Sequence, residues 1–428
     1  MPANSGRRHV PIYGHRGFGV SMPGSPATVP ENSFHAFEAA VAAGAEGAEL
    51  DVWLTQDSEV IVTHGTGSDA EGFLHEVTLE GRMPDGRPLK IEDLDYKASL
   101  QAGGLILRDA WVNTVDLTEW GGDPSAASRL YAGMGQPRQA EERERYATSS
   151  VAVAVQTESP SGDAPTPQLE GPGWTQLPLL QEVLEQFQGR LKFNVELKGT
   201  KPDLSRRVKD IARQFPGTVA RISTFMWLPP EEDAAALCLD PVESERADVE
   251  KCPNGHIPAD LAGPLSNSSS SDSQTFENGE EAPDPPLALL YQHREAPASV
   301  DRVLQCHRRY GSDWAHLKFN TLLPPGFETG QLETKALGAP VALRTYVEAL
   351  QEGGVRVMSW WGKGVDRPEC VLASLWAGMD SICPNDVEMA KRVTNWWVSG
   401  KQGGEWGELV RSWDSEWKGE KEGGKCSR

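Results

Sequence analysis

The sequence lacks several features that would assign it to a common class of protein. No apolar run approaches the ~20 residues that a helix needs to span a bilayer. Its six cysteines are scattered over 428 residues, without a CxxC pair or the spacing of a disulfide framework. The N-terminal segment has no apolar signal-peptide region. We therefore expect a cytoplasmic protein with reduced thiols and no transmembrane segment.

Nucleotide-binding motifs and basic stripes are also missing. Neither a GxGxxG loop after a strand nor a Walker sequence is present. The chain holds 41 Lys and Arg against 62 Asp and Glu, a formal net charge of −21. A net anion repels the phosphate backbone, so nucleic acid is disfavoured as a partner.

Two segments supply the whole charge imbalance. Residues 66–172 carry a net charge of −9 and residues 229–285 a net charge of −12. The other 264 residues are neutral overall, and their number is about that of a single (β/α)8 barrel. The acidity is therefore no argument against an anionic substrate, because it lies outside the candidate site.

Strand and helix patterns alternate along the neutral part of the chain. Strands are expected at 9–14, 47–54, 59–63, 191–198, 219–225, 287–291, 355–360 and 379–383. Helices are expected between them, at about 33–43, 181–188, 203–214, 300–310, 341–353 and 367–377. This alternation favours a parallel α/β fold, and eight strands predict a TIM-type (β/α)8 barrel. An open doubly wound sheet is the alternative.

We expect one catalytic barrel over residues 1–400, interrupted by the two acidic insertions. Residues 66–172 are polar over much of their length but include ordered patterns, which predicts a partly folded insertion. Residues 229–285 contain a serine-rich run at 266–273 and have the composition of a linker.

The C-terminal tail, residues 401–428, is rich in tryptophan. Trp406, Trp413 and Trp417 follow helical spacing. Docking of this helix on the barrel is the favoured interpretation. Weak contact with a membrane surface is the alternative, since tryptophan favours interfaces, although acidic neighbours argue against anionic lipid.

Residues with catalytic chemistry gather at the expected carboxyl ends of strands, where a barrel builds its active site. They are His15, Arg16, Glu49, Asp51, His64, Glu196 and Lys198. Three carboxylates on two strands offer the hard oxygen ligands that Mg²⁺ or Ca²⁺ prefers, and would repel one another without a cation. Two histidines suit general acid and base work, and the two basic side chains suit a phosphate. The set fits metal-assisted hydrolysis or transfer at a phosphodiester.

A turn at 56–58 predicts an antiparallel hairpin. With Asp51 opposite His64, the centre of the turn falls between Asp57 and Ser58, where the turn residues stand. We therefore expect His64 to return beside Asp51.

Several short motifs, in this order, resemble the glycerophosphodiester phosphodiesterase family. They are GHRG at 14–17, PENS at 30–33 with Phe37, GA at 44–45, ELDV at 49–52 with Thr55 and Asp57, VTH at 62–64, LP at 177–178, NVELK at 194–198, STF at 223–225, and the strand at 357–360. Each motif alone is weak, whereas their order and spacing are specific. The resemblance covers residues 9–65, 174–227 and about 340–390. It implies a TIM barrel with an insertion after the second histidine, where residues 66–172 lie.

The resemblance also implies a division of roles. By this resemblance, His15 and His64 would carry out acid–base catalysis. Glu49, Asp51 and Glu196 would bind one divalent cation, Mg²⁺ or Ca²⁺. Arg16 and Lys198 would bind phosphate, and Trp360 would line the substrate pocket. The implied reaction belongs to lipid and glycerol metabolism and splits a small or lipid-derived glycerophosphodiester into glycerol 3-phosphate and an alcohol. Direct attack by water and prior attack by a glycerol hydroxyl are both open.

The chain departs from the family pattern in three places. Gly65 stands where the family has Asp after the second histidine, which removes a carboxylate that could orient an imidazole. The motif after Trp360 and the closing segment at 384–386 also differ. Two alternatives are therefore kept: a lysophospholipase D acting on lysoglycerophospholipids, and a non-catalytic barrel that binds phospholipid headgroups.

Overall fold

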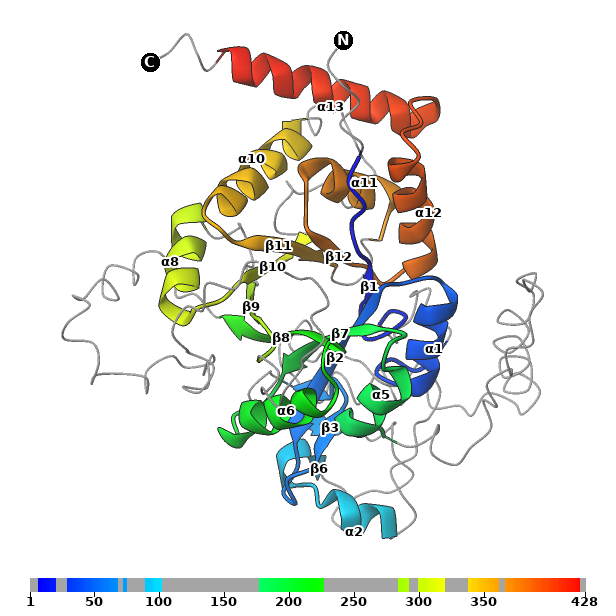
Figure 1. Ribbon diagram of the computed structural model, residues 1–428, viewed down its shortest axis with the longest axis vertical. Helices are drawn as coiled ribbons and strands as arrows, with labels where there is room; N and C mark the ends of the chain where they lie inside the picture. Colours follow the sequence, from blue (N-terminus) through cyan, green and yellow to red (C-terminus); the bar gives the residue numbers. More distant parts are fainter. Residues whose placement is uncertain are drawn as a thin grey trace, which may run out of the picture.

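Eight parallel strands form the wall of a barrel in the computed structural model (Figure 1). The structure describes residues 7–20, 29–67, 72–74, 89–101, 177–226, 284–291, 299–319, 338–361 and 366–423. The strand order is β1-β2-β7-β8-β9-β10-β11-β12. A parallel bridge between Ile12 and Ile382 joins the two ends of this order and nearly closes the barrel. The predicted (β/α)8 fold is confirmed.

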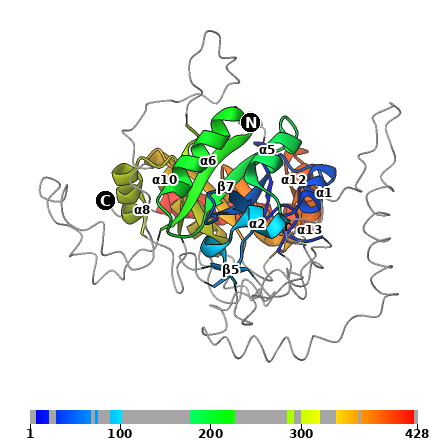
Figure 2. The same cartoon turned by 90° about the horizontal axis from the view of Figure 1, so that it is seen from below.

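Helices cover the outside of these strands (Figure 2). The wall consists of β1 (Tyr13–Gly14), β2 (Gly47–Leu54), β7 (Lys192–Leu197), β8 (Val219–Met226), β9 (Leu287–Tyr291), β10 (Trp314–Lys318), β11 (Arg356–Trp360) and β12 (Ser381–Cys383). The helices are α1 (Phe34–Ala42), α5 (Leu180–Phe187), α6 (Asp203–Gln214), α8 (Val300–Tyr310), α10 (Gly338–Glu352), α11 (Pro368–Ala377) and α12 (Val387–Val398). Every residue of β2 is buried, because one face meets helices and the other fills the barrel.

The start of α1 shows how the sequence fixes a helix next to the barrel rim. The Ala36 N–H donates to the Ser33 hydroxyl at 3.2 Å, which caps the helix. Gly44, with φ of 79°, lies just beyond its end. The Phe37 ring packs edge-on against Phe193 with centroids 5.3 Å apart. This packing anchors the loop before α1, whose residues reach the candidate site.

The prediction of a barrel strand at 59–63 is wrong. The strand found there, β3 (Val60–Val62), pairs antiparallel with β2 and lies off the barrel path. A turn as short as 56–58 can join only antiparallel neighbours, since a parallel crossover needs a dozen or more residues. The eighth strand of the wall is β10. It was not predicted from the sequence, because the residues at its alternate positions, Trp314, His316 and Lys318, do not form an apolar run.

The hairpin itself is antiparallel as predicted, but its register differs by one residue. Val52 pairs with Val62 and Leu54 with Val60, so the hairpin is centred on Asp57. Ser58, with φ of 66°, adds a left-handed third residue to the loop. The residue opposite Asp51 is consequently Thr63, whose N–H donates to the Asp51 carbonyl at 2.9 Å.

Short elements follow the hairpin. They are β4 (Thr66–Gly67), β5 (Gly72–Leu74) and β6 (Leu89–Lys90) in a small antiparallel sheet, the 3₁₀ turn η1 (Ile91–Asp93) and α2 (Tyr96–Gln101). The Tyr96 hydroxyl donates to the Leu177 carbonyl at 2.8 Å and ties this segment to the barrel. The rest of the predicted insertion at 66–172, and residues 229–283, lie outside the described residues. The domain limits therefore stay predictions.

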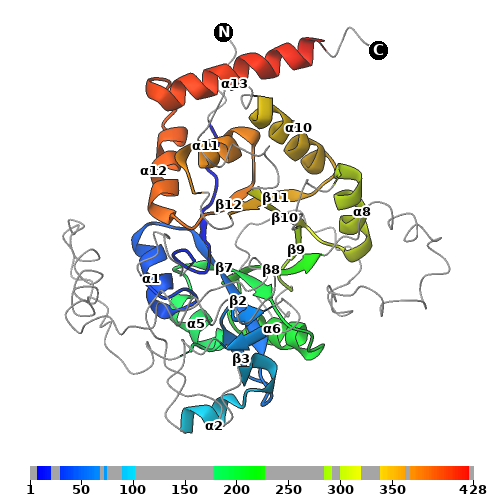
Figure 3. The same ribbon diagram turned by 180° about the vertical axis from the view of Figure 1, so that it is seen from behind.

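The tail forms a long helix, α13 (Gly404–Gly423), that crosses one end of the molecule beside α10 and α11 (Figures 1 and 3). Trp413 is buried, with its ring centroid 5.7 Å from that of Trp376. The Trp376 Nε1–H donates to Asp414 at 2.9 Å. Docking of the described part of the tail on the barrel is thus confirmed, while contact with a membrane surface stays a prediction. In the described ranges, none of the helices has the length and apolarity needed to cross a bilayer.

Replacing Trp413 with alanine should measure what this docking contributes to stability. We expect Trp413→Ala to lower the free energy of unfolding by about 3 kcal/mol, because it leaves a cavity between α13 and α11. The exposed control Lys418→Ala should change it by less than about 0.5 kcal/mol. Urea denaturation of the full chain measures both, and equal small effects would show that α13 does not stabilise the barrel.

Candidate active site

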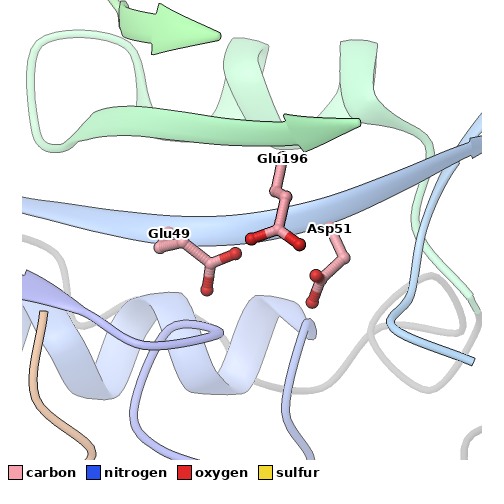
Figure 4. A group of neighbouring side chains, drawn as sticks. All are labelled: Glu49, Asp51 and Glu196. Carbon is pink, nitrogen blue, oxygen red and sulfur yellow. The ribbon is translucent and has the colours of Figure 1, made fainter. Parts of the chain in front are cut away.

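A cluster of three buried carboxylates lies inside the barrel at the β2–β7 pair (Figure 4). Glu49 and Asp51 point inward from β2 because alternate residues share a face. The parallel register pairs Asp51 with Glu196 of β7. One ligand oxygen from each residue lies within 4.8 Å of the other two.

The charge state of this cluster depends on its close packing. Burial, then Asp51 and Glu196, raise the pKa of Glu49 well above its ordinary value. Burial alone would also raise the pKa of Asp51, but His64, Lys198 and Arg16 beside it lower that pKa below its usual range. One proton or one cation would relieve the repulsion.

The donor set fits a divalent cation. Glu49 Oε1 is buried and has no hydrogen-bond partner among the described residues. Its other oxygen accepts from the Arg16 N–H at 2.8 Å. A buried carboxylate oxygen left unpaired is costly, and a cation would pair with it. The residues present therefore suit Mg²⁺ or Ca²⁺, and do not distinguish the two.

Two basic side chains, those of Lys198 and Arg16, lie beside the carboxylates. Lys198 contacts Glu196, and its Nζ lies 3.5 Å from Asp51 Oδ1. Arg16 pairs with Glu31 at 2.9 Å and places its Nε 3.5 Å from Asp51 Oδ2. Burial would lower the pKa of Arg16, but Glu31 and Asp51 raise it above its ordinary value. Both predicted phosphate binders thus lie beside the acidic cluster.

His15 follows β1 and is 7% exposed. Its Nδ1 lies 2.8 Å from Asn385 Oδ1, and its Nε2 lies 3.9 Å from Glu49 Oε2. Burial, followed by the charge of Arg16, lowers the pKa of His15 to about 3. The imidazole is therefore neutral near pH 7 and has an unprotonated nitrogen.

His64 is held by the main chain. Its Nδ1–H donates to the carbonyl of Gly65 at 2.9 Å, because a carbonyl can only accept. Gly65 has a φ of 70°, a conformation that glycine adopts without strain. Burial, then Arg16, lower the pKa of His64 to about 3. The His64 ring is thus oriented by a peptide carbonyl, which does not require a carboxylate side chain at position 65.

Trp360 ends β11 and lies next to the first histidine. Its ring centroid is 6.0 Å from that of His15 and 6.4 Å from that of Phe225. Lys318 places its Nζ 5.5 Å from the Trp360 ring centroid. The structure therefore brings all eight predicted site residues to one end of the barrel, and the roles assigned to them stay predictions.

Sequence reasoning assigned no role to four further residues at the site. Glu31 pairs with Arg16, and Asn32 donates to Asp51 Oδ2 at 2.9 Å. Asn385 contacts His15 and also donates to Asp366 at 3.0 Å. The PENS motif at 30–33 could have predicted a role for Glu31 and Asn32, because it places an acidic and an amide residue together in a loop before a capped helix. Asn385 lies in the closing segment at 384–386 that departs from the family pattern, whereas no local pattern marks Asp366.

Comparison with protein families identifies the family of this barrel. The model of the glycerophosphoryl diester phosphodiesterase family matches residues 15–228, half of the chain. The chain belongs to this family. The match includes every residue of the acidic cluster and both histidines.

Curated relatives match over short stretches. A glycerophosphodiester phosphodiesterase of Caldanaerobacter subterraneus is 44% identical over 65 residues, which are 14% of this chain and 27% of that protein. An uncharacterized protein of Bacillus subtilis is 43% identical over 53 residues, 12% of this chain and 19% of the relative. The chain thus spans less than a third of either relative.

Solved structures of similar fold match nearly end to end at low identity. One is an Oleispira antarctica phosphodiesterase in complex with the product sn-glycerol-3-phosphate, at 12% identity and a TM-score of 0.45, over 90% of this chain and 97% of that one. Another is a glycerophosphodiester phosphodiesterase of Thermotoga maritima, at 14% identity and a TM-score of 0.40, over 90% and 99% of the two chains.

The low pKa of His15 predicts how stability changes with pH. The unfolded chain binds a proton at this residue near pH 6.5, whereas the folded protein binds it only near pH 3. Protonation therefore favours unfolding, and this contribution is absent above pH 6.5 and grows as the pH falls toward 3.

Substitution of His15 should flatten that dependence. We expect His15→Asn to reduce the slope of unfolding free energy against pH by up to about 1.4 kcal/mol per unit between pH 4.5 and 6. His9→Gln, at a side chain that is half exposed, is the control. Urea titrations at several pH values test this, and an unchanged slope in His15→Asn would contradict the buried neutral imidazole.

Proposed function

We propose that this chain hydrolyses glycerophosphodiesters to glycerol 3-phosphate and an alcohol. The observation that carries the proposal is the buried carboxylate cluster flanked by two neutral imidazoles and two cations. Membership of the family supports the same reaction.

His15 and His64 are proposed to move the protons. A neutral imidazole with an unprotonated Nε2 takes the proton of the attacking hydroxyl. The other imidazole returns a proton to the leaving alkoxide. Binding of an anionic phosphodiester favours that protonated form, since a nearby negative charge raises the pKa of an imidazole.

Glu49, Asp51 and Glu196 would hold one divalent cation, Mg²⁺ or Ca²⁺. Such a cation, when bound, polarises a phosphoryl oxygen and offsets developing negative charge. Arg16 and Lys198 are proposed to contact the remaining phosphate oxygens. Glu31 keeps the Arg16 guanidinium oriented, and Trp360 lines the pocket beside His15.

A turnover assay tests the reaction. The purified chain is incubated with glycerophosphocholine and Mg²⁺ or Ca²⁺, and glycerol 3-phosphate is measured. We expect His15→Ala to lower kcat at least 10²-fold, because it removes a proton-transfer group. The control His35→Ala changes a half-buried histidine on α1 and should keep wild-type turnover. Near-normal activity of a folded His15→Ala protein would contradict the assignment.

The same assay separates the alternative functions. Product formed from a lysoglycerophospholipid but not from glycerophosphocholine would favour a lysophospholipase D. Binding of either compound without product under any divalent cation would favour a headgroup-binding barrel. The Gly65 carbonyl counts against this second alternative, because it supplies the imidazole acceptor that the substitution at position 65 had put in doubt.

Cation removal tests the acidic cluster. We expect treatment with EDTA to abolish turnover and readdition of Mg²⁺ or Ca²⁺ to restore it. Calorimetric titration should show one bound cation in the wild type and at least tenfold weaker binding in Glu49→Gln, which replaces a ligand oxygen by an amide. Glu185→Gln, exposed on α5, is the matched control. Full activity in cation-free buffer would contradict the metal role.

A cytoplasmic location is part of the same proposal. Cys306, Cys370 and Cys383 are free thiols, which suits a reducing compartment. Fractionation of cells that express the tagged chain tests this, and recovery with secreted or organellar markers would contradict it.

A further inference from the structure

A chain of hydrogen bonds leads from His15 away from the acidic cluster. Asn385 Oδ1 lies 2.8 Å from His15 Nδ1, and Asn385 Nδ2 donates to Asp366 Oδ1 at 3.0 Å. The second carboxylate oxygen of Asp366 accepts from the Asp386 N–H. The Asp386 side chain in turn caps α12 by accepting from the Met389 N–H at 2.8 Å. This chain of hydrogen bonds, called the relay below, therefore ends at the capped N-terminus of α12.

The neighbours of Asn385 determine which way its amide faces. Within the described residues Nδ2 contacts the Asp366 carboxylate and the Trp361 carbonyl, the latter at 3.4 Å, and both groups are acceptors. A flipped amide would place its oxygen against both. Asn385 Oδ1 must therefore face His15, and His15 Nδ1 must carry the hydrogen. The other ring nitrogen of this neutral tautomer, Nε2, carries no hydrogen and lies 3.9 Å from Glu49 Oε2.

We propose that Asn385 and Asp366 are positioning residues that hold His15 as the Nδ1–H tautomer and direct its Nε2 into the site. The inference rests on the proposed function for the role of His15 in proton transfer. Asn385 is 6% exposed, and it sits directly after β12, next to β1 in the barrel. His15 is also tied there by its own N–H, which donates to the Pro384 carbonyl at 3.0 Å.

The comparison with His64 supports this assignment. That ring is also held as the Nδ1–H tautomer, in its case by the Gly65 carbonyl. Both imidazoles thus present Nε2 as the reactive nitrogen, although one acceptor is a side-chain amide and the other a main-chain carbonyl. The hydrogen bond from the Asn385 NH₂ group to Asp366 fixes which end of the carboxamide faces His15.

Nuclear magnetic resonance reads the tautomer without any assay of turnover. With ¹⁵N-labelled histidine, long-range ¹H–¹⁵N correlations distinguish a protonated from an unprotonated ring nitrogen. We expect His15 in the wild type to show a protonated Nδ1. In Asn385→Leu the acceptor is lost, so the signal should shift toward the Nε2–H form, and kcat should fall about 10- to 100-fold with KM within about twofold.

Asp366→Asn tests the outer end of the relay. Asp366 accepts from the main-chain N–H groups of Asp386 and Asn385 and from the Asn385 side chain. The single oxygen of the new amide cannot face all three donors, so Asn385 should flip in part and the Nδ1–H population should fall. The matched control is Asp380→Asn at the other end of the barrel. Asp380 likewise accepts from a backbone N–H, that of Val357, and from a side-chain amide, that of Gln351, each at 2.9 Å. The Asp380→Asn variant should leave the His15 signal and kcat unchanged.

A double variant distinguishes positioning from packing. Asn385→Asp combined with Asp366→Asn exchanges the carboxylate and the amide, so that the His15 Nδ1–H again faces an acceptor at position 385 and the side chains at positions 385 and 366 again form an amide–carboxylate pair. We expect this exchange to restore the Nδ1–H tautomer and to bring kcat within about tenfold of the wild type. An unchanged tautomer and kcat in both single variants, or no rescue of the tautomer in a folded double variant, would overturn the inference.

Failure of the two proposals can be told apart. If the wild type turns over no glycerophosphodiester yet the His15 tautomer responds to Asn385→Leu and to Asp366→Asn as described, the positioning inference holds and the proposed function falls. If turnover is normal in the single variants while the tautomer is unaltered, the proposed function stands and the positioning inference falls.

Discussion

Burying three carboxylates on one wall of a barrel is possible only if their charge is met at close range. Lys198 and Arg16 meet part of it, and Arg16 brings a fourth carboxylate, Glu31, with it. With all four carboxylates ionised, four acidic and two basic side chains in this described group leave two negative charges, since both histidines are neutral near pH 7. One divalent cation has the charge that balances them. The compensating side chains, Arg16 and Lys198, stand just after the ends of β1 and β7.

Two of the described segments that enter the site are fixed by contacts made outside it. The loop before α1 is held by the Ser33 cap and the aromatic packing of Phe37, and so presents Asn32 to Asp51. The hairpin that delivers His64 is fixed by β-pairing to β2, the same strand that carries two of the carboxylates. Rigid elements thus position the side chains at the rim, which is how a barrel accommodates chemistry on its carboxyl end.

The sequence predicted the barrel, most element limits and all the residues of the acidic cluster. These features have short-range signals: capping residues, alternation along β2 and charged side chains at the ends of strands. The strand β10 was missed because Trp314 and His316 fill the barrel interior, which breaks the apolar pattern of a buried strand. The hairpin register was off by one, because a left-handed Ser58 is a property of the folded turn.

The relay from His15 could not be predicted for a different reason. Asn385 and Asp366 follow β12 and β11, and they lie 370 and 351 positions from the histidine along the chain. Their contact arises only when β12 closes the barrel against β1. A pairing that depends on closure leaves no trace in local sequence, whereas the partner of His64 is its own neighbour.

The two imidazoles therefore differ in how strongly a substitution can affect the hydrogen-bond acceptor that orients them. The acceptor of His64 is a peptide carbonyl, which every amino acid possesses, so substitutions at position 65 can act only through the backbone angle. The acceptor of His15 is a side chain, and a single substitution can remove it. The orientation of His64 is therefore less sensitive to loss of a side chain at its acceptor than the orientation of His15 is.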